Sequence, residues 1–154
     1  MTDSTYRKIF LPQQEHTNQF AQTPDDVWKI LESEFGTLFD PCPANPTQDG
    51  LEIEWSKDQV SYVNPPYNSI PLWLEKATEE MQQGRTIVCL LPCRTGANWF
   101  HDYLIEQSAE IRFVKQGIKF KGYARKSPFP VCIAVFRPGH TGSPKITSVD
   151  FYAS

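Results

Sequence analysis

The sequence predicts an α/β fold, built on a mostly parallel sheet that ends in an antiparallel hairpin. Segments with the apolar spacing of helices alternate with short apolar segments of strand length. One of these, Thr86–Leu91, is a continuous apolar run, as expected of a parallel strand buried on both faces. The closing strands, Glu110–Val114 and Val131–Phe136, have no helix between them, and they must therefore pair antiparallel.

The composition is that of one globular domain. The 154 residues are 40% hydrophobic and 13% aromatic, which suits a chain with a substantial core. No apolar run approaches membrane-spanning length and the N-terminus lacks a signal-peptide core, so we expect a cytoplasmic protein. The net charge of −3 argues against nucleic-acid binding over the whole surface, although it allows a local basic patch.

The cysteines show no metal-binding pattern. None of the four forms a Cys-x-x-Cys pair, which argues against a zinc site and favours reduced, buried side chains. They are Cys42, Cys89, Cys93 and Cys132. We therefore predict no metal.

The N-terminal part is predicted to be a mobile arm, residues 1–18, followed by a helix. The helix begins at Thr23-Pro24, with threonine as the expected N-cap and two aspartates in the first turn, and it ends at Gly36. A capped helix is ordinary structure, but its free N–H groups could also bind a carboxylate.

A strand over Thr37–Phe39 is predicted to lead directly into a proline-rich loop. An acidic residue at the end of a first strand often faces a ligand, and we favour that role for Asp40 over a purely structural turn role. Asp49 is open to two interpretations: turn chemistry before Gly50, or an acid that binds a ribose hydroxyl or an adenine amine. A further short strand could form near Leu51–Ile53.

The most informative motif follows the predicted strand Val60–Val63. It reads Asn64-Pro65-Pro66-Tyr67, and its two prolines prevent further ladder pairing and produce an extended turn. An amide, two carbonyls and an aromatic ring therefore lie at the carboxyl end of a strand, where open α/β sheets bind ligands.

This motif suits a planar amine. The side-chain oxygen of Asn64 and the carbonyl of Pro65 can both accept hydrogen bonds from one NH₂ group, and Tyr67 offers a ring for a nucleobase to stack on. Two such acceptors stabilise the positive charge that develops when the amine attacks an electrophile. The alternative is a Pro-Pro turn that caps the strand, with Tyr67 as packing.

The helix predicted over Asn68–Gln83 is amphipathic. Its apolar stripe faces the sheet, and Gly84 ends it. The charged side chains expected on its exposed face are Glu75, Lys76, Glu79 and Glu80.

The second half of the chain is predicted to hold a helix over Ala97–Gln107, a short strand over Gly117–Phe120 and the closing strands. The loop between the closing strands is basic: it is either a solvated hairpin tip or, as we favour, a contact for a phosphate backbone. Together with Arg94 in another loop, the candidate contacts are Lys119, Lys121, Arg125 and Lys126, with Lys115 beside them. The tail, 138–154, is expected to be loosely ordered, which leaves 19–137 as the folded domain.

With Thr23-Pro24, Asp40-Pro41 and Asn64-Pro65-Pro66-Tyr67 in this order, the sequence resembles the amino-methyltransferases that use S-adenosylmethionine. More narrowly, it resembles the phage-type DNA N-6-adenine methyltransferase (Dam) family. The supporting matches are Asp49-Gly50-Leu51 with Trp55, Leu91-Pro92 with Thr95, Trp99-Phe100 and Phe129-Pro130. The resemblance implies a Rossmann-like methyltransferase sheet, here trimmed, since residues 45–59 are too few for two full strand–helix units.

The resemblance also implies roles for individual residues. Those expected to bind S-adenosyl-L-methionine are Thr23, near the methionine carboxylate, Asp40 and Pro41, near the amino-acid portion, and Asp49, near the nucleoside. Those expected to hold a flipped adenine are Asn64, Pro65, Pro66 and Tyr67. The implied reaction is methylation of the N6 amine of adenine in DNA.

Two alternatives remain open at the level of sequence. The same motif would serve another planar amine, such as an RNA base or a glutamine side chain. The fold could also be a non-catalytic nucleic-acid-binding module. The oligomeric state is not determined by the sequence, and a monomer is favoured.

Overall fold

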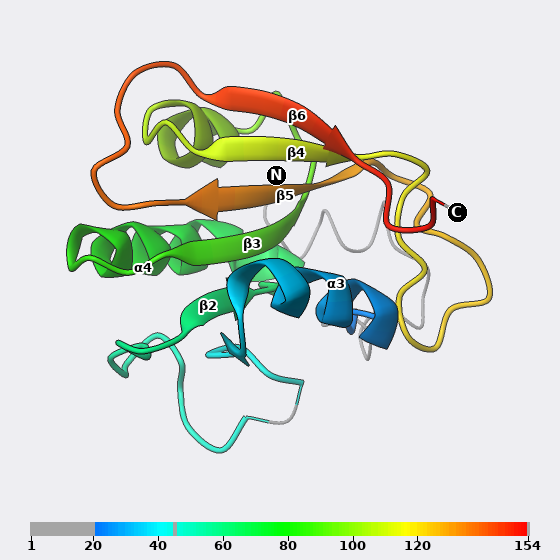
Figure 1. Cartoon of the computed structure of the whole chain (residues 1–154), viewed down its shortest axis with the longest axis horizontal. Helices are drawn as coiled ribbons and strands as arrows, with labels where there is room; N and C mark the ends of the chain where they lie inside the picture. The colour runs from blue at the N-terminus through cyan, green and yellow to red at the C-terminus, as the bar shows by residue number, and fades with distance from the viewer. Residues whose placement is uncertain (1–20, 45, 154) are drawn as a thin grey trace.

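The computed structural model of the chain describes residues 21–44 and 46–153; the predicted N-terminal arm lies outside the described residues. Figure 1 shows a mixed six-stranded sheet with the strand order β1-β2-β3-β5-β4-β6. The strands are β1 Leu38–Phe39, β2 Val60–Val63, β3 Ile87–Pro92, β4 Glu110–Val114, β5 Val131–Phe136 and β6 Lys145–Val149.

The sheet combines parallel and antiparallel pairs, as predicted. Strands β1, β2 and β3 run parallel, and β5 pairs antiparallel with both β3 and β4. Strand β4 therefore runs in the direction of β3, so the carboxyl ends of β1 to β4 lie at one edge of the sheet. This α/β sheet has three parallel strand pairs and two antiparallel pairs, both made by β5, which confirms the predicted fold class at that level.

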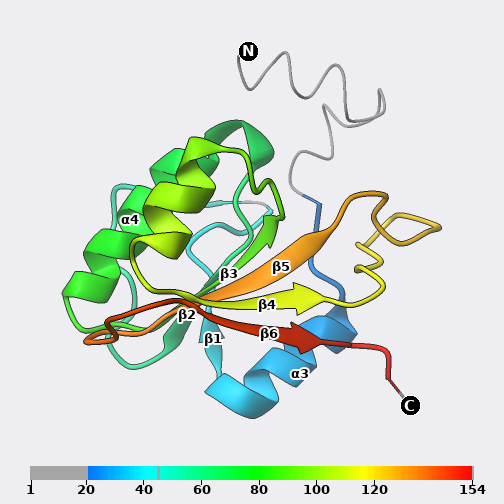
Figure 2. The same cartoon turned by 90° about the horizontal axis from the view of Figure 1, so that it is seen from above.

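Helices cover both faces of the sheet (Figure 2). Helix α3, Asp25–Phe35, lies on one face, and α4, Ile70–Gln82, lies on the other with the short helices η1, Tyr67–Ser69, and η2, Phe100–Ile105. Every residue of β3 is buried, with alternate side chains in the two hydrophobic cores. The continuous apolar run of this strand is explained by burial on both faces.

Two predicted strands are absent from the described part of the chain. Residues 117–120 form an irregular segment, because Gln116 and Gly117 both have positive φ angles and turn the chain there. Ile118 and Phe120 are nevertheless buried, which accounts for the strand-like pattern. Residues 51–53 form a turn, in which the N–H of Glu52 donates to the carbonyl of Asp49 over 3.0 Å.

The two ends of the described chain also differ from expectation. Pro24, not Thr23, is the N-cap of α3, and the Thr23 hydroxyl bonds elsewhere. The tail expected to be loosely ordered contains β6, which pairs in parallel with β4. No helix in the described ranges has the length and apolar character needed to cross a bilayer. The boundaries of the domain at 19 and 137 stay a prediction.

The helix predicted over Ala97–Gln107 contains a π-helix, η2. Its wider turns are seen in two backbone bonds that span five residues, from Glu106 N–H to His101 and from Ala109 N–H to Leu104, each 3.0 Å long.

Candidate functional site

A cleft of about 300 Å³ lies at the carboxyl ends of β1 and β2. Because these strands are parallel and Leu38 lies beside Val60, Asp40 and Asn64 reach the same edge of the sheet. The cleft is lined chiefly by Thr23, Trp28, Asp40, Tyr62, Asn64 and Lys121. Of the residues proposed from sequence, the fold thus brings Thr23, Asp40, Asn64 and Lys121 together.

The carboxamide of Asn64 has a defined orientation. Its Nδ2 donates a hydrogen bond to the carbonyl of Ala21 over 2.5 Å. A carbonyl can only accept, so the nitrogen must face Ala21 and the oxygen must lie on the opposite side of the amide. Asn64 is half-buried in the cleft wall, and its acceptor oxygen takes no part in that bond.

Asp40 combines a turn role with a place in the cleft. Its Oδ1 accepts a hydrogen bond from the backbone N–H of Cys42 over 2.8 Å, which stabilises the loop after β1. Burial raises the pKa of Asp40, and the Cys42 bond opposes this only in part. The turn role is therefore observed, and ligand binding by Asp40 stays a prediction.

Thr23 and Tyr62 join the two walls of the cleft. Their hydroxyls lie 2.5 Å apart, although 39 positions separate them in sequence. The ring of Tyr62 meets that of Trp28 at 79°, with centroids 5.2 Å apart. Burial raises the pKa of the Tyr62 hydroxyl, so this group stays protonated at neutral pH. Sequence reasoning missed both aromatic residues; for Tyr62 the available signal was its position two residues before Asn64 on a strand.

The rest of the central motif is more buried than Asn64. Pro65 and Pro66 are buried, and Tyr67 is 7% exposed. The Tyr67 ring packs edge-on against Phe129, with centroids 5.7 Å apart. Tyr67 is not among the described residues that line the cleft, so stacking of a base on its ring stays a prediction and would require this buried ring to be uncovered.

Pro41 and Asp49 line a second cleft, of about 400 Å³, on the other side of the loop after β1. Cys42 lines both clefts, which places them side by side. The exposed Asp49 accepts the N–H of Leu51 on its Oδ1 over 2.9 Å, so its turn interpretation is observed and its ligand role stays a prediction.

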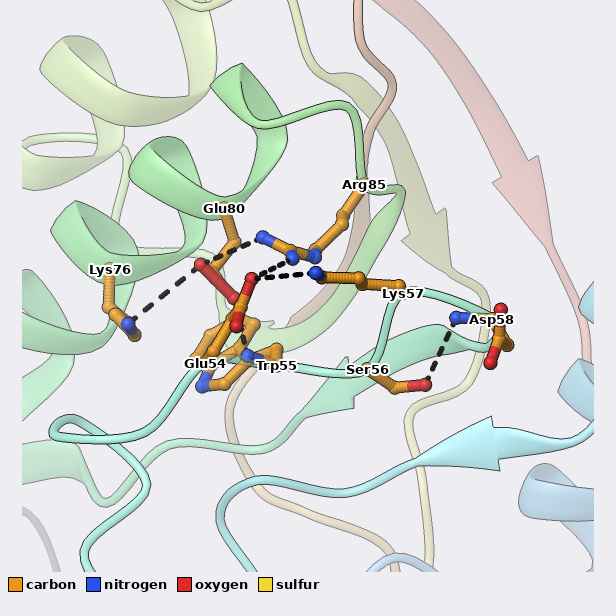
Figure 3. Close-up of polar contacts among 8 residues, drawn as sticks. All are labelled: Glu54, Trp55, Ser56, Lys57, Asp58, Lys76, Glu80 and Arg85. Carbon is orange, nitrogen blue, oxygen red and sulfur yellow. Dashed lines mark hydrogen bonds and ion pairs between the residues drawn. The ribbon is translucent and has the colours of Figure 1, made fainter.

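The loop between these clefts and β2 is attached to α4 by buried charges, shown in Figure 3. Glu80 accepts the backbone N–H of Trp55 over 2.6 Å and pairs with Arg85, 3.3 Å away. Glu80 is only 4% exposed, so its predicted place on the wet face of the helix is wrong. Glu75 and Glu79 are exposed, as expected.

Trp55 connects Glu80 to the loop after β1. Its indole N–H donates to the carbonyl of Gly50 over 2.8 Å. Gly50 itself packs against Pro41 so closely that a Cβ would lie 1.9 Å from the Pro41 oxygen. Any other residue at position 50 would displace the loop that follows Asp40.

The basic loop lies at the same edge of the sheet, after β4 (Figure 1). Lys121 reaches the cleft, where its ammonium group pairs with Asp25 over 2.8 Å. Lys119 and Arg125 are exposed, and Lys126 lies over the Tyr152 ring, 4.7 Å from its centroid. Contact of these side chains and of Arg94 with DNA stays a prediction.

All four cysteines are free thiols, and burial raises the pKa of Cys42 to about 12. In the described residues, no group of three or more His, Cys, Asp or Glu side chains is placed to hold a metal ion.

Two comparisons with known proteins bear on the family of the chain. A family model described as DNA N-6-adenine-methyltransferase (Dam) matches residues 12–129. A curated protein of Escherichia phage T1, named DNA N-6-adenine-methyltransferase, is 29% identical over 96 residues. The match covers 60% of this chain and 38% of the phage protein, so the chain spans well under half the length of that relative.

Proposed function

Since the chain belongs to the DNA N-6-adenine-methyltransferase (Dam) family, we propose that it transfers a methyl group from S-adenosyl-L-methionine to the N6 amine of adenine in DNA. The observation that carries the proposal is the orientation of Asn64. Its amide is held by the Ala21 carbonyl, and its residue lines a cleft shared with Asp40. The sheet supports a trimmed Rossmann-like methyltransferase fold, with parallel strands ending at the cleft.

The cleft fits the methyl donor in its charge. S-adenosyl-L-methionine supplies a methyl group bonded to a positively charged sulfur. Asp40 contributes a carboxylate that is partly desolvated by burial, and Thr23 contributes a hydroxyl. In this proposal Thr23 and Asp40 bind the amino-acid portion, while Pro41 and Asp49, in the adjoining cleft, bind the nucleoside.

The chemistry falls to the central motif. Asn64 Oδ1 and the Pro65 carbonyl would accept the two hydrogens of the adenine amine and so orient its nitrogen toward the methyl donor. Both acceptors bind more strongly as the nitrogen becomes positive, so they stabilise the transition state more than the bound substrate. The amine then loses a proton to water, and no strong base is needed.

Two further groups would present the base. The adenine must leave the duplex, which costs a few kcal/mol. Stacking on Tyr67 would return about 1–3 kcal/mol of this, once the buried ring is uncovered. The basic loop with Lys119, Lys121 and Arg125 would hold the phosphates on either side.

The experiment that tests the proposal is transfer of a labelled methyl group from S-adenosyl-L-methionine to DNA, RNA and protein in parallel. We expect label in DNA alone, recovered as N6-methyladenine after digestion to nucleosides. Label in RNA or in glutamine would replace the proposed substrate, and no label anywhere, with a folded chain, would favour a binding module.

A prediction for Asp40 separates binding from stability. Asp40→Asn keeps an oxygen for the Cys42 N–H but removes the charge, so we expect at least about a ten-fold loss of S-adenosyl-L-methionine affinity with an unchanged or higher Tm. Calorimetry and thermal unfolding measure the two effects.

The pH dependence of stability provides the control. Burial raises the pKa of Asp40 in the folded chain, so the folded state holds the proton more tightly than the unfolded state. The stability contribution of this group is therefore present below its ordinary pKa and is lost as the pH rises through the folded value. As the pH rises through this range, the free energy of unfolding of the native chain should therefore fall relative to that of Asp40→Asn. An identical pH dependence in the two proteins would contradict the raised pKa of Asp40.

A prediction for Lys121 concerns DNA. Lys121→Ala should reduce the salt dependence of DNA binding, the slope of log Kd against log salt concentration, by about 1. Lys57→Ala is the matched control, because Lys57 is exposed and precedes the amino end of β2. Fluorescence anisotropy at several salt concentrations measures both, and equal slopes for the two variants would exclude a phosphate contact by Lys121.

A further inference from the structure

The cleft has an aromatic corner that no proposed role uses. The rings of Trp28, from α3, and Tyr62, from β2, meet at 79° with their centroids 5.2 Å apart, and both residues line the cleft. Tyr62 is 1% exposed and its hydroxyl bonds to Thr23, so it has little surface for a ligand. Trp28 is only half-buried, and it is therefore the ring that a bound molecule can touch.

The charges around this corner favour a cation. Asp40 lines the same cleft, and within residues 21–44 and 46–153 no ion pair includes it. The other charged groups at the cleft are Asp25 and Lys121, which neutralise each other over 2.8 Å. Among the described residues, the cleft thus holds one carboxylate outside any ion pair, and its wall includes an accessible indole. An aromatic face attracts a cation within about 6 Å of its centroid, most strongly for tryptophan.

We propose that Trp28 contacts the sulfonium of the methyl donor and makes the cleft selective for the charged donor over its neutral thioether product, S-adenosyl-L-homocysteine. This inference rests on the proposed function. Donor and product differ by one methyl group and one positive charge, so a ring that senses charge changes their relative affinity. Tyr62 acts as a positioning residue, since its edge-to-face contact and its bond to Thr23 hold the corner in place.

The same residue could instead only pack, or could stack on an uncharged adenine ring. Either role would affect donor and product alike, because both carry the same nucleoside. The ratio of the two dissociation constants therefore isolates the charge effect from loss of shape, and it requires no methyl transfer.

The test is calorimetry of the full chain with S-adenosyl-L-methionine and, separately, with S-adenosyl-L-homocysteine. For Trp28→Leu we expect the donor's affinity to fall relative to the product's by about 2- to 30-fold. Trp28→Phe keeps a weaker ring and should give an intermediate ratio; it also serves if the leucine variant does not fold. Phe35→Leu is the matched control: it removes a ring from the far end of the same helix, where Phe35 packs against Arg112, and should leave the ratio unchanged.

The outcomes are distinguishable. An unchanged ratio in both Trp28 variants, with or without an equal loss of both ligands, would overturn the inference and leave the proposed function intact. Failure of the native chain to bind either molecule at millimolar concentration would overturn the proposed function, and the inference with it.

Discussion

Replacing Asn64 with alanine should lower the rate of methyl transfer by about 100- to 1,000-fold, the range seen when one preorganised polar contact to a developing charge is removed. The variant loses the side-chain oxygen that would accept from the adenine amine. It also loses the bond from Nδ2 to the Ala21 carbonyl. Because the acceptor acts mainly in the transition state, we expect the affinity for S-adenosyl-L-methionine to change by less than about two-fold. Single-turnover kinetics and calorimetry measure the two quantities.

Two further variants define what Asn64 contributes. Asn64→Asp keeps an acceptor oxygen but loses the N–H that donates to the Ala21 carbonyl, so it should retain part of the activity. Gln82→Ala removes a carboxamide from the exposed end of α4 and should leave the rate unchanged. A normal rate in Asn64→Ala would show that Asn64 has no part in methyl transfer. Loss of S-adenosyl-L-methionine binding in that variant would instead show that Asn64 binds the cofactor.

Replacing Glu80 with alanine should lower the free energy of unfolding by about 3 kcal/mol, as expected when one partner of a buried ion pair is removed. Glu80 is 4% exposed and Arg85 8%, so water cannot replace the lost partner of the ion pair. The substitution leaves the Trp55 N–H without its acceptor, and it leaves Arg85, whose Nε already lacks a bond, with Glu54 as the remaining acidic partner among the described residues. Urea unfolding measures the change.

The neighbouring position provides the control for Glu80. Glu79→Ala changes the same residue type on the same helix at an exposed site, and it should shift stability by less than about 0.5 kcal/mol. Glu80→Gln keeps an acceptor for Trp55 and should fall between the two. Equal stabilities for the Glu79 and Glu80 variants would show that the buried network does not hold the loop.

This network also connects stability to the candidate site. Trp55 bonds to Gly50, and Gly50 leaves no space between itself and Pro41. Loosening Glu80 should therefore raise the Kd for S-adenosyl-L-methionine through the loop after Asp40, at temperatures where the chain remains folded. The two clefts on either side of that loop would be disturbed together.

Local signals were sufficient for the elements with strong patterns. The apolar run of β3, the amphipathic pattern of α4 and the paired prolines after β2 each act over a few residues, and all three appear where expected. The strand predictions were wrong where pairing with another strand decides whether a strand forms. Strand β6 has three exposed side chains among its five residues, and it exists because β4 offers it a partner. Residues 117–120 have a strand-like pattern, but in the described part of the chain they pair with no strand of the sheet.

The sequence by itself determined which groups end each strand, since prolines and glycines stop the chain there: Asp40 after β1 and Asn64 after β2. Only the tertiary structure decided which of them meet. Thr23 reaches Tyr62 across 39 positions, and Asn64 reaches Ala21 across 43. The exposed or buried state of Glu80 was decided in the same way. Contacts at such separations depend on sheet order and helix packing, and a residue's neighbours in sequence carry no direct record of them.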